Sequence, residues 1–162
     1  MKTLVVLQNA YSYDPLGERK IPFVVWLHAF LKCKTGKRFC YFFGERKSVF
    51  DKVSKQELHF INTTKSWGVG SKSKLKPDIE YVKNEIETFQ PDFIISCGNQ
   101  AKEVIQSLWI GSVLYIPHPA SRNLTNSLLD EARKIINNMI VKDTIKVELI
   151  QHKGRFEIKS LL

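Results

Sequence analysis

Cysteine is scarce in this chain, which has three cysteines among its 162 residues. Cys33, Cys40 and Cys97 form no Cys-x-x-Cys pair, and their number is odd. This pattern argues against a disulfide framework and against a four-cysteine zinc or iron–sulfur site. Cys33 and Cys97 stand in apolar runs, so we interpret them as small core residues. A reducing compartment is the simplest setting, and we expect an intracellular protein, cytoplasmic or associated with the nucleoid.

Long apolar runs are also missing. No segment approaches the unbroken apolar length of a membrane span, so we expect no membrane partner. The first apolar stretch reaches Gln8 and Asn9 too soon for a signal peptide, and residues 3–8 are instead predicted to form a strand. The length suits one domain, residues 1–162, whose core is large enough to fold alone.

Acidic residues are few relative to basic ones. Lysine and arginine number 25 against 16 acidic residues, which gives a formal charge of +9. Such an excess favours a polyanionic partner, because each phosphate contact releases condensed counterions. We therefore expect the partner to be a nucleic acid, although charge alone also fits a solubilising surface.

Apolar runs of strand length alternate with helical patterns along the chain. Strands are predicted at residues 3–8, 57–62, 92–97 and 112–117, and helices at residues 21–33, 77–89, 98–109 and 123–141. Residues 38–43, "RFCYFF", are predicted to be a short aromatic strand or a buried connection. Continuous apolar strands that alternate with helices indicate a parallel sheet covered on both faces. The expected fold is a three-layer α/β/α domain with a central, mostly parallel four-stranded sheet.

The tail, residues 143–162, differs from the rest of the chain. Ile145, Val147 and Leu149 alternate with polar residues, and "HKGR" interrupts the pattern before Phe156 and Ile158. This is typical of a β-hairpin, which we expect to be appended at the edge of the sheet.

Polar or small residues follow each of the four predicted strands. In an open parallel sheet, ligands bind beyond the carboxyl ends of the strands. Asn9, Asn62, Asn99 and His118 are therefore expected to converge on one crevice. Each of them alone has a plain interpretation as a turn, a cap or an exposed residue. Their shared position at strand ends favours a site.

Taken in order, these segments resemble the motifs of the uracil-DNA glycosylase superfamily. "LQNAYS" is similar to its first motif, with Gln8, Asn9 and Tyr11 on the Gln, Asp and Tyr positions. "FINTT" resembles the strand-end motif that carries Asn62, and "ISCGNQAKEVI" resembles the strand-Gly-x-x-Ala-helix segment. "HPASRN" resembles the minor-groove loop, in the form closest to the single-strand-selective monofunctional branch. Asn9 in place of Asp is typical of that branch and of the mismatch-specific branch. The resemblance spans roughly residues 4–135.

The resemblance implies a role for each residue that would meet the flipped base. Asn9 would orient the attacking water, and His118 would donate a hydrogen bond to the base carbonyl as charge develops there. Asn62 would read the base edge with its amide, which offers both a donor and an acceptor. Gln8 would line the same pocket. Tyr11 would stand against carbon 5 of the base and exclude a methyl group.

The resemblance also implies contacts to DNA, single- or double-stranded, around that base. Arg122 would enter the duplex and fill the vacated space. Phe23 is a candidate for stacking on the flipped ring, with a core aromatic as the plain alternative. Further contacts are expected from Gly98, Asn99 and Ser121. The basic loop after Asn62 would follow the phosphates or would simply be a solvated loop, and its lysines of interest are Lys65, Lys72 and Lys74.

Together these features predict a monofunctional, metal-independent DNA glycosylase with no cofactor, acting as a monomer on uracil or a related modified pyrimidine. Within the motif clusters a Schiff-base lysine is missing, apart from Lys65 at the edge of one, so lyase activity is not expected. Two alternatives stay open. One is a non-catalytic, basic nucleic-acid-binding module with the same fold, and the other is a glycosylase for a hypermodified phage base.

Overall fold

The computed structural model of the protein describes residues 1–8, 22–64, 76–140 and 142–162. The strands are β1 (Thr3–Leu7), β2 (Leu58–Asn62), β3 (Phe93–Cys97), β4 (Ser112–Ile116), β5 (Lys146–His152) and β6 (Arg155–Ser160). The helices are α1 (Phe23–Phe30), α2 (Lys34–Phe43), α3 (Arg46–Ser54), α4 (Ile79–Phe89), α5 (Asn99–Leu108) and α6 (Asn126–Asn137). None of the helices in these ranges has the length and apolar character that crossing a membrane requires.

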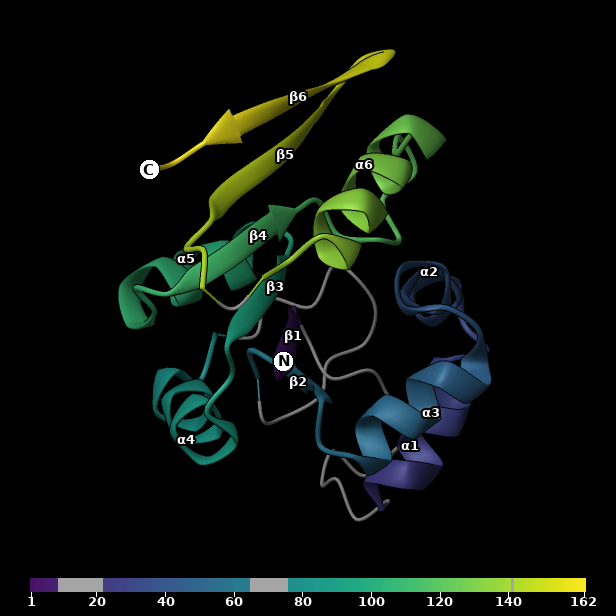
Figure 1. The fold of residues 1–162 in the computed structure, drawn as a ribbon, viewed down its shortest axis with the longest axis vertical. Helices are drawn as coiled ribbons and strands as arrows, with labels where there is room; N and C mark the ends of the chain where they lie inside the picture. The colour runs from purple at the N-terminus through teal and green to yellow at the C-terminus, as the bar shows by residue number, and fades with distance from the viewer. Residues whose placement is uncertain (9–21, 65–75, 141) are drawn as a thin grey trace.

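The strands form one six-stranded sheet in the order β2-β1-β3-β4-β5-β6. Pairing is parallel from β2 through β5, and β6 alone runs antiparallel to its neighbour. The mostly parallel sheet and the C-terminal hairpin are thus confirmed. The hairpin is more than an appendage, because β5 pairs directly with β4 and extends the sheet (Figure 1). Gly154, with φ of +78°, completes the tight turn between β5 and β6.

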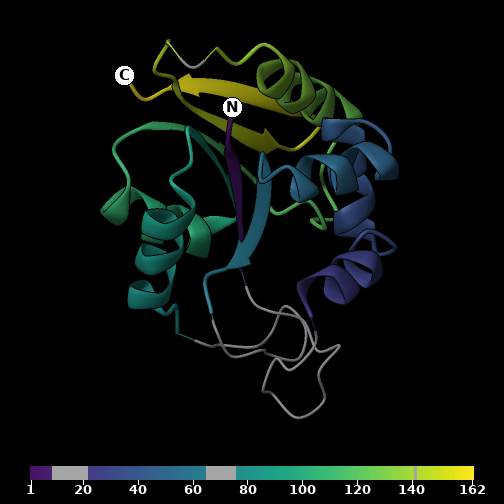
Figure 2. The same ribbon diagram turned by 60° about the horizontal axis from the view of Figure 1, so that its bottom comes forward.

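Helices cover both faces of the sheet, as the uninterrupted apolar strands predict. Side chains such as Val5, Phe60 and Ile95 pack against α1, α2, α3 and α6 in one core. Alternate side chains, such as Val6 and Ile94, pack against α4 and α5 in a second core. Figure 1 shows α4 and α5 on one side of the strands and the remaining helices on the other, and Figure 2 shows the same layers after rotation.

The segment from residue 38 to 43 belongs to helix α2, so the expectation of a short strand or a buried connection is wrong. Aromatic residues favour strands in general. Here Phe39 and Phe42 are buried at a helical spacing of three while Tyr41 is exposed, and Cys33 caps the helix by accepting a hydrogen bond from the N–H of Gly36 at 3.5 Å. The helix predicted over residues 21–33 is correspondingly short and ends at Phe30. Helix α3 was not predicted.

Gly36 allows α2 to approach the end of α1 closely. An ideal Cβ at this position would lie 1.9 Å from the carbonyl oxygen of Phe30, which is backbone and cannot move aside alone. The Gly36→Ala variant is therefore expected to lose about 1–3 kcal/mol of unfolding free energy through overpacking. Chemical denaturation would measure this, with the exposed neighbour Lys37→Ala as the control. Equal stability of the two variants would contradict the close approach.

Candidate active site at the carboxyl ends of the strands

The carboxyl ends of β1 to β4 lie at one edge of the sheet. In the strand register, Leu7 pairs with Asn62 at the end of β2, and Cys97 pairs with Ile116 at the ends of β3 and β4. Val6 pairs with Ser96, one residue before Cys97. The four segments that follow the strands therefore begin at the same level of the sheet.

The end of β2 is tied tightly to the end of β1. The hydroxyl of Thr63 donates to the carbonyl of Gln8 at 2.5 Å, and its N–H lies 2.9 Å from the carbonyl of Leu7 and 3.0 Å from that of Gln8. The carbonyl of Thr63 in turn accepts from the N–H of Asp78, ahead of α4, at 2.7 Å. Asn62 is buried beside this junction and takes part in polar contacts of its own. The junction therefore fixes the position of Gln8, just after β1, relative to Asn62 at the end of β2.

His118 sits in a short loop whose backbone is held on several sides. Its carbonyl accepts from the N–H of Ser121 at 2.9 Å. The guanidinium of Arg38, from α2, donates to the carbonyl of the buried Pro119. On the β3 side, the N–H of Gly98 donates to the carbonyl of Ile116 at 2.9 Å. The imidazole is therefore carried on a constrained loop, since a bond within the loop, the Arg38 contact from α2 and the Gly98 contact after β3 fix its path.

The hydrogen bonds of His118 determine which ring nitrogen can act as a donor. Its Nδ1 accepts from the N–H of Ala120 at 3.1 Å. In the neutral ring the hydrogen then resides on Nε2, because Nδ1 uses its lone pair in this contact. Burial also lowers the pKa of His118 below its ordinary value, by disfavouring the charged form. The side chain is thus a neutral imidazole that presents an Nε2–H donor.

Gly98 lies next to His118 at the start of α5. Its φ of +88° is a conformation that side chains disfavour, and an ideal Cβ here would lie 3.6 Å from the Cβ of His118. Asn99 follows as the first residue of α5 and is exposed. The glycine turn and the histidine loop are therefore in close approach.

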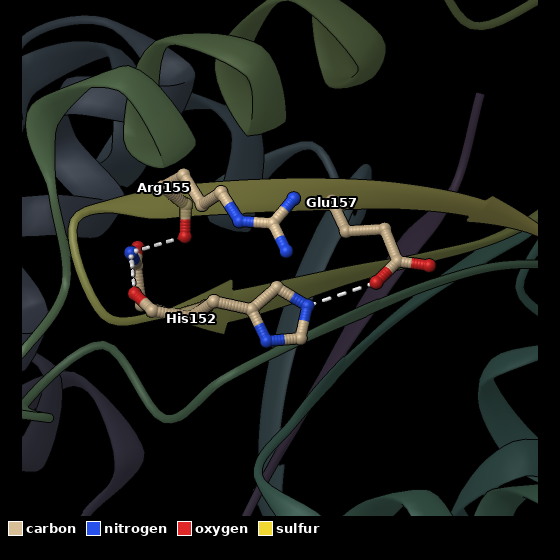
Figure 3. A network of polar contacts seen from close by, with 4 residues as sticks. His152, Arg155 and Glu157 are labelled. Carbon is tan, nitrogen blue, oxygen red and sulfur yellow. Dashed lines mark hydrogen bonds and ion pairs between the residues drawn. The ribbon is translucent and has the colours of Figure 1, made fainter.

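The hairpin supports the far end of the same loop through Gln151. The Oε1 atom of Gln151 accepts from both the N–H and the hydroxyl of Thr125, each at 3.1 Å, and Thr125 caps α6. Its Nε2 atom donates to the carbonyls of His152 at 2.8 Å and Arg155 at 2.9 Å. Figure 3 shows His152 and Arg155 at the turn, with His152 also bonded to Glu157 across the hairpin at 2.8 Å. One amide thus joins the turn of the hairpin to the cap of α6.

The predicted DNA contacts fall at different places around this loop. Ser121 is half-buried and Arg122 is exposed, both directly after the histidine turn. Phe23, at the start of α1, stacks on Trp26 with ring centroids 5.6 Å apart and lies 5.2 Å from the ring of His59. This is the packing expected of a partly buried core aromatic, and its role in base stacking stays a prediction.

Five of the predicted site residues lie outside the described residues. They are Asn9, Tyr11, Lys65, Lys72 and Lys74. The structure places Gln8, Asn62, Gly98 and His118 at the carboxyl ends of the central strands. The functional roles of all the predicted site residues remain sequence predictions.

Cys97 ends β3 within the edge that carries these residues. It is fully buried, and burial raises its pKa far above the ordinary value, so it is a thiol and not a nucleophile. Across residues 1–8, 22–64, 76–140 and 142–162, no group of three or more His, Cys, Asp or Glu side chains is placed to hold a metal ion.

Sequence reasoning missed the residues that support the loop. The sequence predicts a short strand or a buried connection at Arg38, and only its position on helix α2 brings it to Pro119. Gln151 is not among the predicted site residues, and no local pattern links it to Thr125, which is 26 residues away. These contacts depend on tertiary structure, so sequence periodicity carries no signal for them.

The lowered pKa of His118 predicts a stability effect at mildly acidic pH. The unfolded chain takes up this proton near a pH of about 6.5, whereas the folded chain takes it up only at lower pH. Below that value the unfolded state binds more protons, so the free energy of unfolding falls as the pH falls. In His118→Asn, whose Oδ1 can still accept from Ala120, this part of the decrease should vanish. Denaturation curves at pH 7.5 and 5 would measure it, and identical pH dependence in both proteins would contradict it.

The Gln151 contacts predict a shared loss of stability in the hairpin and the loop. Gln151→Ala would leave Thr125 and two carbonyls without their partner, so we expect a loss of about 1–3 kcal/mol in unfolding free energy. Amide hydrogen exchange should also become faster at Leu128, whose N–H donates to the hydroxyl of Thr125. The exposed Lys153→Ala in the same turn is the control. Unchanged exchange at Leu128 would disprove the coupling.

Comparison of the chain with known families and other proteins gave no match. No protein family matches it. No curated protein and no solved structure matches it either. The resemblance to the uracil-DNA glycosylase superfamily therefore rests on the motifs of this sequence alone.

Proposed function

We propose that this protein is a monofunctional DNA glycosylase that removes uracil or a related modified pyrimidine. In this reaction the bond between C1′ and the base nitrogen breaks, and the base leaves with the electron pair. The oxygen of water forms the new bond to C1′, and the proton of the water passes to solvent or to the base. The protein must therefore stabilise negative charge on the departing base and hold one water molecule.

The observation that carries this proposal is the state of His118. A neutral imidazole with hydrogen on Nε2 can donate to the base carbonyl without being charged itself. Such a donor, aimed where charge develops, is the most valuable single device for this type of reaction. Because Arg38 and Ser121 hold the loop in place, the donor is preorganised before the substrate arrives. Asn9 is the proposed water-orienting residue.

The distribution of charge supports DNA as the partner. Residues 32–55, which include α2 and α3, contain eight lysines and arginines and two acidic residues. Most of these basic side chains are exposed, and Arg38 among them reaches the histidine loop. A basic surface that continues to the site suits a polyanionic strand whose base enters that site.

A single-turnover excision assay tests the proposal. Labelled single- and double-stranded oligonucleotides would carry uracil, 5-hydroxymethyluracil, thymine opposite guanine, or modified cytosines. The parent protein should release one of these bases and leave an abasic site. His118→Ala should lower the rate by about 100- to 1000-fold, as expected for the loss of an oxyanion donor. Asn9→Ala should lower it by about 100-fold, because the water loses its orientation.

His118→Asn is the matched control for the loop. It keeps an acceptor for the Ala120 N–H and lacks a donor at the position of Nε2, so it should be as slow as His118→Ala while its loop stays intact. Equal excision by the parent and both variants would indicate a contaminating activity. Failure to excise any base, with salt-sensitive DNA binding retained, would favour the non-catalytic binding module. A product only from hypermodified phage DNA would identify the remaining alternative.

A further inference from the structure

A cavity of about 300 Å³ adjoins the glycine turn and the histidine loop, and His118 does not line it. Its walls come from the start of α5, the end of β4, the loop before α6, and strand β5. Gly98 and Pro117 take part in the walls, and each adjoins His118, in space and in the chain respectively. The cavity exists because β5 extends the sheet beyond β4. None of the roles proposed above for His118, Asn62 or Asn9 uses it.

Three of the polar side chains that line this cavity are Lys102, Glu148 and Tyr115. The Nζ of Lys102, from α5, lies 2.6 Å from the Oε2 of Glu148, from β5. These side chains are only 29% and 15% exposed. Tyr115 pairs with Glu148 in the strand register and is almost fully buried. Burial and the charge of Glu148 raise the pKa of Tyr115, so its phenol stays protonated. The cavity therefore holds a carboxylate beside an ammonium and a hydroxyl.

The ion pair leaves hydrogen-bonding capacity unused. Lysine has three N–H donors and a carboxylate has two acceptor oxygens. The contact between the Nζ of Lys102 and the Oε2 of Glu148 uses one donor and one of the two carboxylate oxygens. Both side chains remain partly exposed toward the cavity. A ligand that accepts from Lys102 and donates to Glu148 can therefore bind both groups at once.

The charges of the cavity determine which ligands fit. A phosphate is disfavoured, because Glu148 neutralises Lys102 and repels an anion. A planar heterocycle with an acceptor next to donors is favoured instead, and Pro117 and Leu124 provide apolar wall for its faces. The volume is at the small end of ligand sites, which suits one base.

Among the common bases, guanine presents the matching edge. Its Watson–Crick edge offers the O6 acceptor followed by the N1–H and N2–H donors. Lys102 can donate to O6 while the carboxylate of Glu148 accepts from N1–H and N2–H. Thymine and uracil would turn a second carbonyl toward the carboxylate, and cytosine and adenine lack the adjacent pair of donors. Lysine to guanine O6 is also a common contact in DNA recognition.

We propose that this cavity holds an unpaired guanine of the strand that carries the excised base, as a neighbour of the flipped nucleotide. The inference rests on the proposed function for the identity of the strand. Enzymes that flip a base set their sequence context through contacts to the flanking nucleotides. Ser121, in the loop that carries Arg122, lies at the cavity, so a strand that follows this loop passes its opening. Glu148 and Lys102 are the specificity-determining residues.

Binding of free nucleosides tests the cavity without reference to excision. Guanosine should bind the parent protein at least tenfold more tightly than inosine, which lacks the N2 amino group, and than thymidine, as followed by NMR titration. 7-Deazaguanosine, which keeps the whole Watson–Crick edge, should bind like guanosine. Equal binding of guanosine, inosine and thymidine would overturn the proposal. This comparison needs no variant, so it does not depend on whether a variant folds.

Two variants then assign the contact. For Glu148→Gln and Lys102→Met we expect a loss of about tenfold in one of two quantities. These are the preference for guanosine over inosine and the affinity for guanosine. Glu157→Gln, an exposed carboxylate on the same hairpin, should change neither. Guanosine preference that persists in a folded Glu148→Gln variant would overturn the assignment.

Excision separates this proposal from the proposed function. Single-stranded oligonucleotides would carry the excised base with guanine, hypoxanthine, adenine, cytosine or thymine on either side. At subsaturating protein, the single-turnover excision rate should be about tenfold higher with guanine on one side of the excised base than with hypoxanthine there. In Glu148→Gln the two rates should be equal. Excision that ignores both flanks would overturn the cavity proposal alone. Selective guanosine binding by a protein that excises nothing would overturn the glycosylase alone.

Discussion

The parallel register of β1 to β4 is the constraint on which the site depends. Because Leu7 lies opposite Asn62 and Cys97 lies opposite Ile116, four loops leave the sheet at one level. A slip of one residue in any of these pairs would turn its side chains to the other face of the sheet. The side chains of Leu7 and Asn62 would then leave their buried positions and face solvent or the helices on the opposite face of the sheet. Burial of the two cores therefore specifies the register, and the register in turn assembles the site.

The site combines this rigid edge with support from outside the central strands. Arg38 reaches the histidine loop from one helical layer, and Gln151 reaches the cap of α6 from the hairpin. Each supporting group hydrogen-bonds backbone or a cap, so the loop is positioned by contacts that leave the imidazole Nε2 available. The histidine is consequently oriented by its surroundings, and its neutrality follows from its burial.

Sequence patterns predicted the elements whose apolar residues follow a simple pattern. The four central strands were recognisable as short continuous apolar runs, the hairpin by alternation, and α4 by apolar residues at a spacing of three to four. The prediction for residues 38–43 was wrong. The aromatic content of this segment favours a strand, but burial of Phe39 and Phe42 at a spacing of three favours a helix. For the site, the strand-end rule predicted that Asn62 and His118 share an edge. The tautomer of His118, the Arg38 contact and the pair of Lys102 with Glu148 arise from tertiary contacts, and these have no periodic signal.

The β5–β6 hairpin enlarges the sheet, and it also makes β6 the edge strand on that side of the sheet. Among the strands of the described residues, β6 has β5 as its one neighbour, so the outward N–H and C=O groups of its six residues form a free edge. Free edges can recruit strands from other copies and lead to aggregation. Arg155, Glu157 and Lys159 project charge from alternate positions of this edge, and all three are exposed. Two chains of charge +9 that approached there would have to desolvate these groups. The hairpin therefore forms a wall of the cavity with β5 and opposes self-association of the sheet with β6.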